Sequence, residues 1–171
     1  MANVTGVAME RVYISAGSNS NRQQNIAMAL ARLRQQFGKL SISPVYESEA
    51  IDGTGDNYYN LVVGLDTDLS VSEIHHYLRR VEEALGRERG KSGAITIDLD
   101  LLLYGRVSGN IDGIQLPHPD LERYRHVLQP FVDIAGDMTL PGSERSVKSL
   151  LDDPQMADTI ECVGTGNHEI S

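Results

Sequence analysis

Two aspartates stand two residues apart inside an otherwise apolar stretch, TIDLDLLLYG, which runs from Thr96 to Gly105. The stretch is typical of a buried strand, and side chains alternate between the two faces of a strand. Asp98 and Asp100 therefore share one face, with their Cα atoms roughly 6.5–7 Å apart. Two carboxylates at this spacing repel each other unless a cation offsets their charge, and Mg²⁺ shared with substrate phosphates is the usual solution. The alternative is a solvated strand face with two ordinary aspartates.

A basic loop, RERGKSGA, leads directly into this stretch and contains Arg87, Arg89 and Lys91. Cations beside a metal-binding carboxylate pair favour a polyphosphate as the ligand. The alternative for these three side chains is a solvated basic loop. Four apolar residues of the stretch are expected to face the core, opposite the aspartates: Ile97, Leu99, Leu101 and Leu103.

The composition narrows the class of protein. The chain has 171 residues, of which 40% are hydrophobic and 23% charged, so one domain with a sizeable core is expected. A formal net charge of −9 disfavours nucleic acid as a partner, and no apolar stretch is long enough to span a membrane. Cys162 is the only cysteine, which excludes an intrachain disulfide. Because the N-terminal residues also lack the pattern of a secretory signal, a cytoplasmic location is expected.

Apolar and turn patterns predict the order strand, helix, strand, strand, helix, strand. The elements are a strand over 11–18, a helix that ends at Gly38, a strand that contains Pro44, a strand over 58–66, a helix from the Ser70–Glu73 capping box to Gly86, and the aspartate strand. This order predicts a ferredoxin-like α/β sandwich, an α+β fold in which helices pack on an antiparallel sheet. A single domain over 11–153 is expected, after an N-terminal extension (1–10) and before a polar C-terminal tail (154–171).

Two further features are predicted from local sequence. A hairpin is expected around SGN (108–110), and LPHPDLERYRHVLQPFVDIA predicts a turn followed by a helix. The neighbouring His75 and His76 lie on the second helix, where solvent exposure is expected rather than ligand binding.

The stretch TIDLDLLLYG resembles the signature strand of the 6-hydroxymethyl-7,8-dihydropterin pyrophosphokinase family of folate-pathway enzymes. Five more pieces resemble the family in its order along the chain: YISAGSN, SPVYESEAI, NYYNLVV, EEALGRERG and LPHPDL. The resemblance covers residues 11 to 135 and implies the ferredoxin-like fold reached above. It also implies a reaction in which the pyrophosphoryl group of ATP moves, as one unit, to the hydroxymethyl oxygen of a reduced pterin, with Mg²⁺ as cofactor.

The resemblance assigns roles residue by residue. Asp98 and Asp100 would be the metal-binding and catalytic carboxylates, and Arg87 and Lys91 would act on the phosphates beside them. The positions implied to bind ATP are Glu82, Arg87, Arg89, Leu101 and His118. The positions implied to bind the pterin are Ser48, Ile51, Tyr58 and Asn60. An asparagine within an apolar strand needs a hydrogen-bond partner, which supports a site at Asn60 independently of the resemblance.

The chain departs from the family pattern at several positions of the site, and a family tryptophan is absent, with Ser92 nearest to its place. Ile95 stands where the family has an arginine, and Tyr124 and His126 stand where it has an arginine and a phenylalanine. Lys91 would partly cover for Ile95, although a lysine does not reproduce a bidentate guanidinium. Arg125 flanks the lost arginine position and is assigned to ATP, and His126 is assigned to the pterin as a stacking ring.

Three classes of function follow. The first is a working pyrophosphokinase, as a monomer or homodimer that binds ATP and a reduced pterin, without nucleic acid or membrane partners. The second is a relative that still binds pterin or nucleotide but has weak, lost or altered catalysis. The intact aspartate pair favours the first class, and the replaced arginine and aromatic residues favour the second. The third, a nucleic-acid-binding ferredoxin-like domain, is disfavoured by the negative charge.

Overall fold

The computed structural model describes residues 8–86, 95–156 and 158–165. Helices and strands follow one another in this order: β1 (Glu10–Ser18), α1 (Arg22–Phe37), β2 (Ser41–Ile42), β3 (Pro44–Ser48), β4 (Tyr58–Thr67), α2 (Val71–Ala84), β5 (Asp98–Tyr104), β6 (Gly109–Ile111), β7 (Ile114–Leu116), the 3₁₀ helix η1 (Pro119–Glu122), α3 (Arg125–Ala135), α4 (Val147–Leu151) and β8 (Ile160–Thr165). None of the helices in these ranges is long and apolar enough to cross a membrane.

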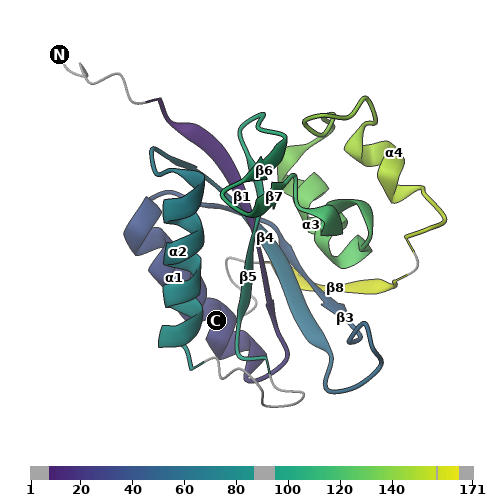
Figure 1. The fold of residues 1–171 in the computed structure, drawn as a ribbon. Coiled ribbons are helices and arrows are strands. Elements are labelled where there is room, and N and C mark those ends of the chain that lie inside the picture. The colour runs from purple at the N-terminus through teal and green to yellow at the C-terminus, as the bar shows by residue number, and fades with distance from the viewer. Residues whose placement is uncertain (1–7, 87–94, 157, 166–171) are drawn as a thin grey trace.

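The main sheet has the strand order β5-β1-β4-β3-β8, with β2 paired to β4, and its pairings are antiparallel. Helices α1 and α2 cover one face of this sheet, and α3 and α4 lie on the other side (Figure 1). The α+β fold and its ferredoxin-like order are therefore confirmed. Side chains alternate along β4, where Leu61, Val63 and Leu65 pack in the core on the α1–α2 side and Val62 packs on the α3 side.

The second helix shows why local sequence was a good guide to this fold. Ser70 Oγ accepts a hydrogen bond from the Glu73 amide at 3.1 Å, and Glu73 Oε1 accepts one from the Ser70 amide at 2.9 Å. This is the predicted capping box, and it fixes the start of α2. The apolar stripe then buries one side of the helix against the sheet, through Ile74, Leu78, Val81 and Leu85.

A bulge in β5 changes the face of the strand on which one predicted core residue, Leu103, lies. Ile14 of β1 pairs with Leu101, but the next residue towards the N-terminus, Tyr13, pairs with Leu103, so the register shifts by one residue. An extra residue in one strand reverses the facing of everything beyond it. Leu103 therefore packs with Tyr13 on the α3 side and not with Leu99 and Leu101 on the α1–α2 side. All four predicted residues are therefore buried, but only Ile97, Leu99 and Leu101 lie opposite the aspartates, and the predicted facing was wrong for Leu103.

Two further boundaries differ from expectation. The segment assigned to a polar tail contains β8, which pairs with β3 and extends the sheet at that edge. The hairpin β6–β7 turns at Asp112 and Gly113, both with positive φ (53° and 88°), a few residues beyond the expected SGN. Glycine adopts such a backbone without strain, which explains the position of the turn.

Candidate active site

Register across three strands brings the predicted metal and pterin residues to one face of the sheet. Asp98 lies opposite Gly17, and Gly17 lies opposite Asn60 on the far side of β1. In the next row with the same facing, Asp100 lies opposite Ser15. Since neighbouring strands are roughly 4.8 Å apart, the backbones of Asp98 and Asn60 are separated by about 9.5 Å. The small residues of β1 leave this interval open: a Cβ atom added at Gly17 would lie only 3.4 Å from Asn60 Oδ1.

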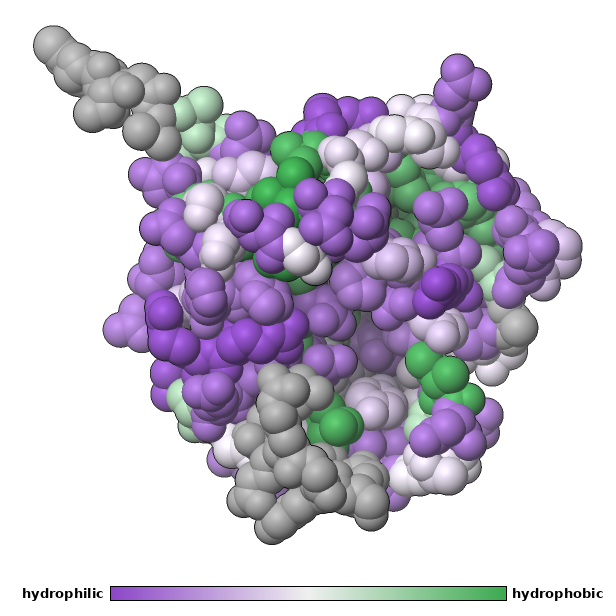
Figure 2. Space-filling model, viewed as in Figure 1, coloured by the Kyte–Doolittle hydropathy of each residue, from purple (hydrophilic) through white to green (hydrophobic). Residues whose placement is uncertain are grey.

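A cavity of about 400 Å³ occupies this face. It is within the size range of small-molecule sites. Seven of the predicted site residues line it: Ser48, Ile51, Tyr58, Asn60, Asp98, Asp100 and His126. Ile95, Asp120 and Val127 also contribute to its wall. Figure 2 shows the molecule hollowed on this side, with mainly hydrophilic residues around the hollow.

The electrostatics of the aspartate pair fit a cation. Burial and, next, the neighbouring carboxylate of Asp98 raise the pKa of Asp100 to about 6, although His118 and Arg79 oppose the shift. A site where a second negative charge is this unfavourable is stabilised by a divalent ion. Within the described ranges no group of three or more His, Cys, Asp or Glu side chains could hold a metal. Two carboxylates supplemented by phosphate and water oxygens are the donor set that suits Mg²⁺.

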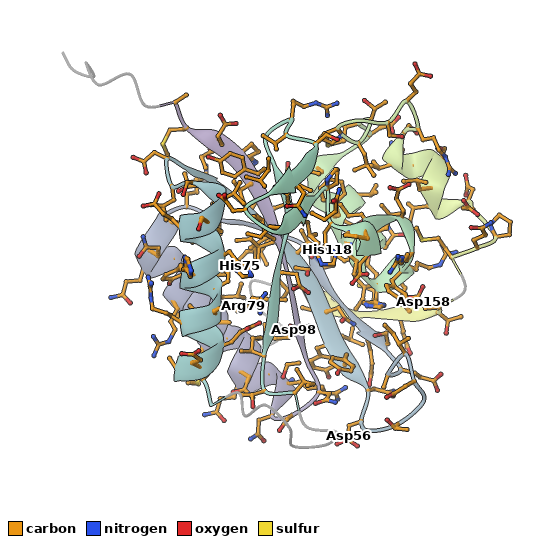
Figure 3. All side chains as sticks on the ribbon, viewed as in Figure 1. Asp56, His75, Arg79, Asp98, His118 and Asp158 are labelled. Atoms are coloured by element: carbon orange, nitrogen blue, oxygen red, sulfur yellow. The ribbon has the colours of Figure 1, made fainter. Side chains whose placement is uncertain are left out.

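A cation that the sequence analysis missed lies beside this pair. Arg79 of α2 donates to Glu82 Oε1 at 2.5 Å, and its other terminal nitrogen lies 3.7 Å from Asp100 Oδ1. Glu82, 1% exposed, in turn accepts a hydrogen bond from the Leu99 amide at 2.7 Å. His75, expected to be solvated, is half-buried and accepts from Arg79 Nε at 3.3 Å. Figure 3 shows His75 and Arg79 on the α2 side of β5 and Asp98. The i, i+3 spacing of Arg79 and Glu82 was the signal available in the sequence.

The entry to β5 is fixed by the first loop rather than by a side chain of its own. The Asn19 amide donates to the carbonyl of Ile95 at 3.1 Å, and Asn19 Oδ1 accepts from the Ile95 amide at 2.6 Å. Ser18 Oγ lies 3.4 Å from the same carbonyl. These bonds use only the backbone of Ile95, so its side chain is free to vary without loss of this connection. The cations predicted just before it, Arg87, Arg89 and Lys91, lie outside the described residues.

Asn60 has the partner that its position demands. Its Nδ2 donates to Ser48 Oγ at 2.8 Å and to the carbonyl of Tyr46 at 3.2 Å. Both amide hydrogens are thus used within the protein, and Oδ1 is the atom that remains to accept from a ligand. Tyr58, two residues before Asn60 and therefore on the same face of β4, lines the same cavity.

The predicted nucleotide residues Leu101 and His118 lie differently. The side chain of Leu101 is 3% exposed and packs in the core, so it would meet a nucleotide only through its backbone, on the terminal strand of the sheet. His118 is anchored at the start of η1, where its amide donates to the Leu102 carbonyl at 2.9 Å and its Nδ1 accepts from the Asp120 amide at 3.1 Å. His118 is also close enough to Asp100 to lower the pKa of that carboxyl. This placement is compatible with a turn residue, as the local sequence predicts, and with a residue that contacts the nucleotide, as the resemblance implies.

Arg125 and His126 are both held by the segment that follows α4. The guanidinium of Arg125 donates to the carbonyls of Leu151 (2.9 Å), Met156 (3.1 Å) and Asp158 (3.3 Å). His126 Nδ1 lies 2.8 Å from Asp158 Oδ2. Of these two residues, only His126 lines the cavity. An ATP contact by Arg125 would require these carbonyl bonds to break. Sequence reasoning missed Asp158, because a lone aspartate 32 residues from its partner gives no local signal.

A ferredoxin-like sheet that presents an acidic pair and a hydrogen-bonding asparagine to one cavity is suited to an enzyme that handles phosphates. A family model for 7,8-dihydro-6-hydroxymethylpterin-pyrophosphokinase matches residues 13–136. The chain belongs to this family. By class it is a transferase, a pyrophosphokinase of folate synthesis, as the resemblance implied.

Relatives of known name agree with this assignment. The 2-amino-4-hydroxy-6-hydroxymethyldihydropteridine pyrophosphokinase of Haemophilus influenzae is 33% identical over 142 residues, which cover 80% of this chain and 88% of the relative. The enzyme of the same name from Pseudomonas aeruginosa is 32% identical and is covered to 85%. The folic acid synthesis protein fol1 of Pneumocystis carinii is 35% identical, but the chain spans only 20% of that protein.

Solved structures support the fold. A structure of Plasmodium falciparum HPPK-DHPS superposes with a TM-score of 0.70 at 11% identity, covering 87% of this chain and 46% of that one. Identity at this level establishes a common fold and leaves the details of the site to this chain's own residues.

Proposed function

We propose that this chain transfers the pyrophosphoryl group of ATP to the hydroxymethyl oxygen of 6-hydroxymethyl-7,8-dihydropterin, with Mg²⁺ held by Asp98 and Asp100. One observation supports this most directly. The aspartate pair and Asn60 face the same cavity from either side of Gly17, so a phosphate donor on one side and a heterocycle on the other would meet in between.

Each group of residues has a distinct task in this proposal. Bound Mg²⁺ would neutralise the charge of the transferred group. Asp98 and Asp100 would orient the phosphates on the α2 side of the cavity. Asn60 Oδ1 would accept from the pterin edge, its orientation fixed by the bonds of Nδ2 to Ser48 and to Tyr46. Tyr58 and His126 would supply aromatic walls.

The remaining predicted residues complete the nucleotide side. We assign Arg87 and Arg89 the phosphate contacts that the resemblance implies, Lys91 a phosphate contact that partly covers for Ile95, and His118 a contact to the nucleotide. Glu82 would act through the Leu99 amide, which it anchors, and so would position the aspartate strand. The position of Ile51, 65% exposed at the rim of the cavity, suits a residue that covers the bound pterin.

A second candidate function is a relative that binds both ligands but transfers slowly. Two observations favour it. Ile95, an apolar residue, lines the cavity where the family has an arginine. Arg125, which flanks the other lost arginine position at Tyr124, is engaged by three backbone carbonyls.

One assay separates the two candidates. Purified protein is incubated with ATP, Mg²⁺ and 6-hydroxymethyl-7,8-dihydropterin, and AMP release is measured, with Asp100→Ala as the inactive control. Turnover on the order of 1–10 s⁻¹ supports an ordinary enzyme of this family. AMP release indistinguishable from that of Asp100→Ala, together with calorimetric binding of both ligands, would establish the second candidate. Absence of both binding and AMP release would contradict either one.

A further inference from the structure

His126, which lines the cavity, is paired with the carboxylate of Asp158. His126 Nδ1 is 2.8 Å from Asp158 Oδ2, and the same oxygen accepts from the His126 amide at 3.0 Å. Asp158 Oδ1 accepts from the Arg125 amide at 2.6 Å. Burial would raise the pKa of Asp158, but the hydrogen bonds from His126 and from these two amides outweigh it and lower the pKa to about 2. Asp158 is therefore a carboxylate that only accepts, which requires a proton on Nδ1 of His126.

The ring of His126 is fixed on more than one side. Tyr124 stacks on it, with ring centroids 5.2 Å apart and an angle of 25° between the planes. Asp158 holds its Nδ1 edge, and the side chain of His126 is only 15% exposed. The same ring lines the cavity together with Asn60 and Tyr58. A side chain held in this way loses little rotamer freedom when a ligand binds.

We propose that Asp158 is a positioning residue for the substrate cavity, which fixes the tautomer of His126 so that Nε2 accepts a hydrogen bond from an N–H or O–H group of the bound heterocycle. Nδ1 is engaged by Asp158, so Nε2 is the ring nitrogen that remains for a ligand. A phenylalanine, as found in the family at this position, offers a face for stacking and no acceptor. The chain would thus read one more donor on its ligand than a phenylalanine does.

The C-terminal segment is the part of the fold that provides this function. Arg125 connects α3 to the carbonyls of Leu151, Met156 and Asp158. Beyond Asp158, β8 pairs with β3, the strand that ends at Ser48 in the same cavity. In Figure 3 Asp158 lies on the α3 side of the view, and Arg79 and Asp98 lie nearer α2. The proposal rests on the proposed pterin site, and it concerns the side of that site away from the metal.

A competing explanation is that Asp158 only caps α3. A cap requires the contacts of the carboxylate with the amides of Arg125 and His126, but it has no need of a particular ring tautomer. The two explanations therefore differ in what they expect at the imidazole and at the ligand.

The first test is ¹⁵N NMR of His126 in the neutral imidazole form. We expect wild type to have its proton on Nδ1, and Asp158→Asn, whose amide donates, to move it to Nε2. Asp153→Asn is the matched control, since Asp153 is a nearby carboxylate whose hydrogen bonds come from Gln155 and Arg145 and whose pKa is affected by no histidine of the described residues. A proton on Nε2 in wild type would overturn the proposal. So would a proton that stays on Nδ1 in Asp158→Asn.

The second test is a double-variant cycle on the binding of 6-hydroxymethyl-7,8-dihydropterin, with a non-hydrolysable ATP analogue and Mg²⁺ present. In the background that keeps His126, Asp158→Asn should weaken pterin binding about tenfold, because one hydrogen bond to the ligand is lost. In the His126→Phe background it should change binding less than about twofold, because no acceptor remains to be positioned. Equal weakening in both backgrounds would leave Asp158 as a cap alone and overturn the proposal, although the proposed function would stand. If neither wild type nor His126→Phe binds the pterin, the proposed function is contradicted, and so is the proposed ligand contact of His126.

Discussion

The cavity has two sides, which differ in how their polar groups are balanced. The aspartate side comprises Asp98, Asp100, Arg79, Glu82 and His118, and the histidine side comprises Ser48, Tyr58, Asn60, His126 and Asp158. On the aspartate side, one carboxyl has its pKa raised to about 6 by burial and by its neighbour. On the histidine side, the carboxylate of Asp158 is satisfied by donors within the protein, and its pKa is lowered.

This difference separates a group of side chains whose charge favours a cation from one whose side chains are already held by internal hydrogen bonds. Excess negative charge in a partly buried place favours binding of a positive ion. Internal hydrogen bonds instead fix side-chain orientation before the ligand arrives, which reduces the entropy cost of binding. We therefore expect changes of Asp98 and Asp100 to alter turnover and metal dependence, and changes of His126 and Asp158 to alter pterin affinity.

The largest effect is expected for Asp100→Ala. Loss of a metal ligand removes several kcal/mol of transition-state stabilisation, which corresponds to at least about 10³ in kcat. Affinity for the pterin should change little, since the histidine side is intact. The AMP assay and calorimetry with a non-hydrolysable ATP analogue measure the two quantities. Should Asp100→Ala bind the analogue as tightly as wild type in Mg²⁺, the residue is not a metal ligand.

The next effect is a gain. Ile95→Arg should raise turnover by up to about 10²–10³, because one phosphate-contacting donor contributes about 2.7–4 kcal/mol in the transition state. The fold should tolerate the change, since the bonds of Ile95 to Asn19 involve only its backbone. Ile95→Met is the apolar control and should leave turnover as it is. If wild type already turns over at ordinary rates and Ile95→Arg adds nothing, another residue fills the role of the missing arginine.

Arg79→Met should lower stability by about 1–3 kcal/mol, because buried Glu82 loses its charged partner. The loss is limited because Glu82 keeps its bond from the Leu99 amide and Arg79 is itself 28% exposed. Urea unfolding of Arg79→Met, Glu82→Gln and the double variant measures it. We expect the double variant to be less destabilised than the sum of the two single variants. Additive losses would show that the 2.5 Å contact contributes nothing to stability.

The smallest effect concerns Asp158 and pH. Its pKa in the folded protein is depressed to about 2, so its contribution is present at neutral pH and is lost as pH falls from about 4 through 2. Asp158→Asn should therefore be less stable than wild type by about 1 kcal/mol at pH 7. The difference should shrink towards zero near pH 2, as measured by urea unfolding at several pH values. A difference that is the same at pH 7 and pH 2.5 would contradict this assignment.

Sequence was sufficient where structure depends on nearby residues. The common facing of Asp98 and Asp100 follows from strand alternation, and the start of α2 follows from Ser70 and Glu73, three residues apart. Both were predicted correctly. The facing of Leu103 was not predicted, because the bulge that changes it depends on pairing with Tyr13, some ninety positions earlier in the chain.

Long-range contacts also explain the gaps in the predicted site. Arg125 was assigned to ATP from its place beside a lost arginine, but the carbonyls that its guanidinium meets lie 26 to 33 residues further on. The sequence of β8, IECVGT, lacks a clear apolar alternation, and its strand state follows from pairing with β3. Asp158 could not be recognised as a site residue until that segment had a place.

The position of β8 at the end of the sheet has a consequence for self-association. While β8 is in place, one edge of β3 is hydrogen-bonded. If β8 detached, that edge would present unpaired N–H and C=O groups, which are a template for strand addition by another chain. Asp158 lies two residues before β8, so the same event would release His126. Exposure of an aggregation-prone edge and loosening of the substrate cavity would then be a single transition. A ligand that binds in the cavity would stabilise the state with β8 in place and would therefore also suppress aggregation.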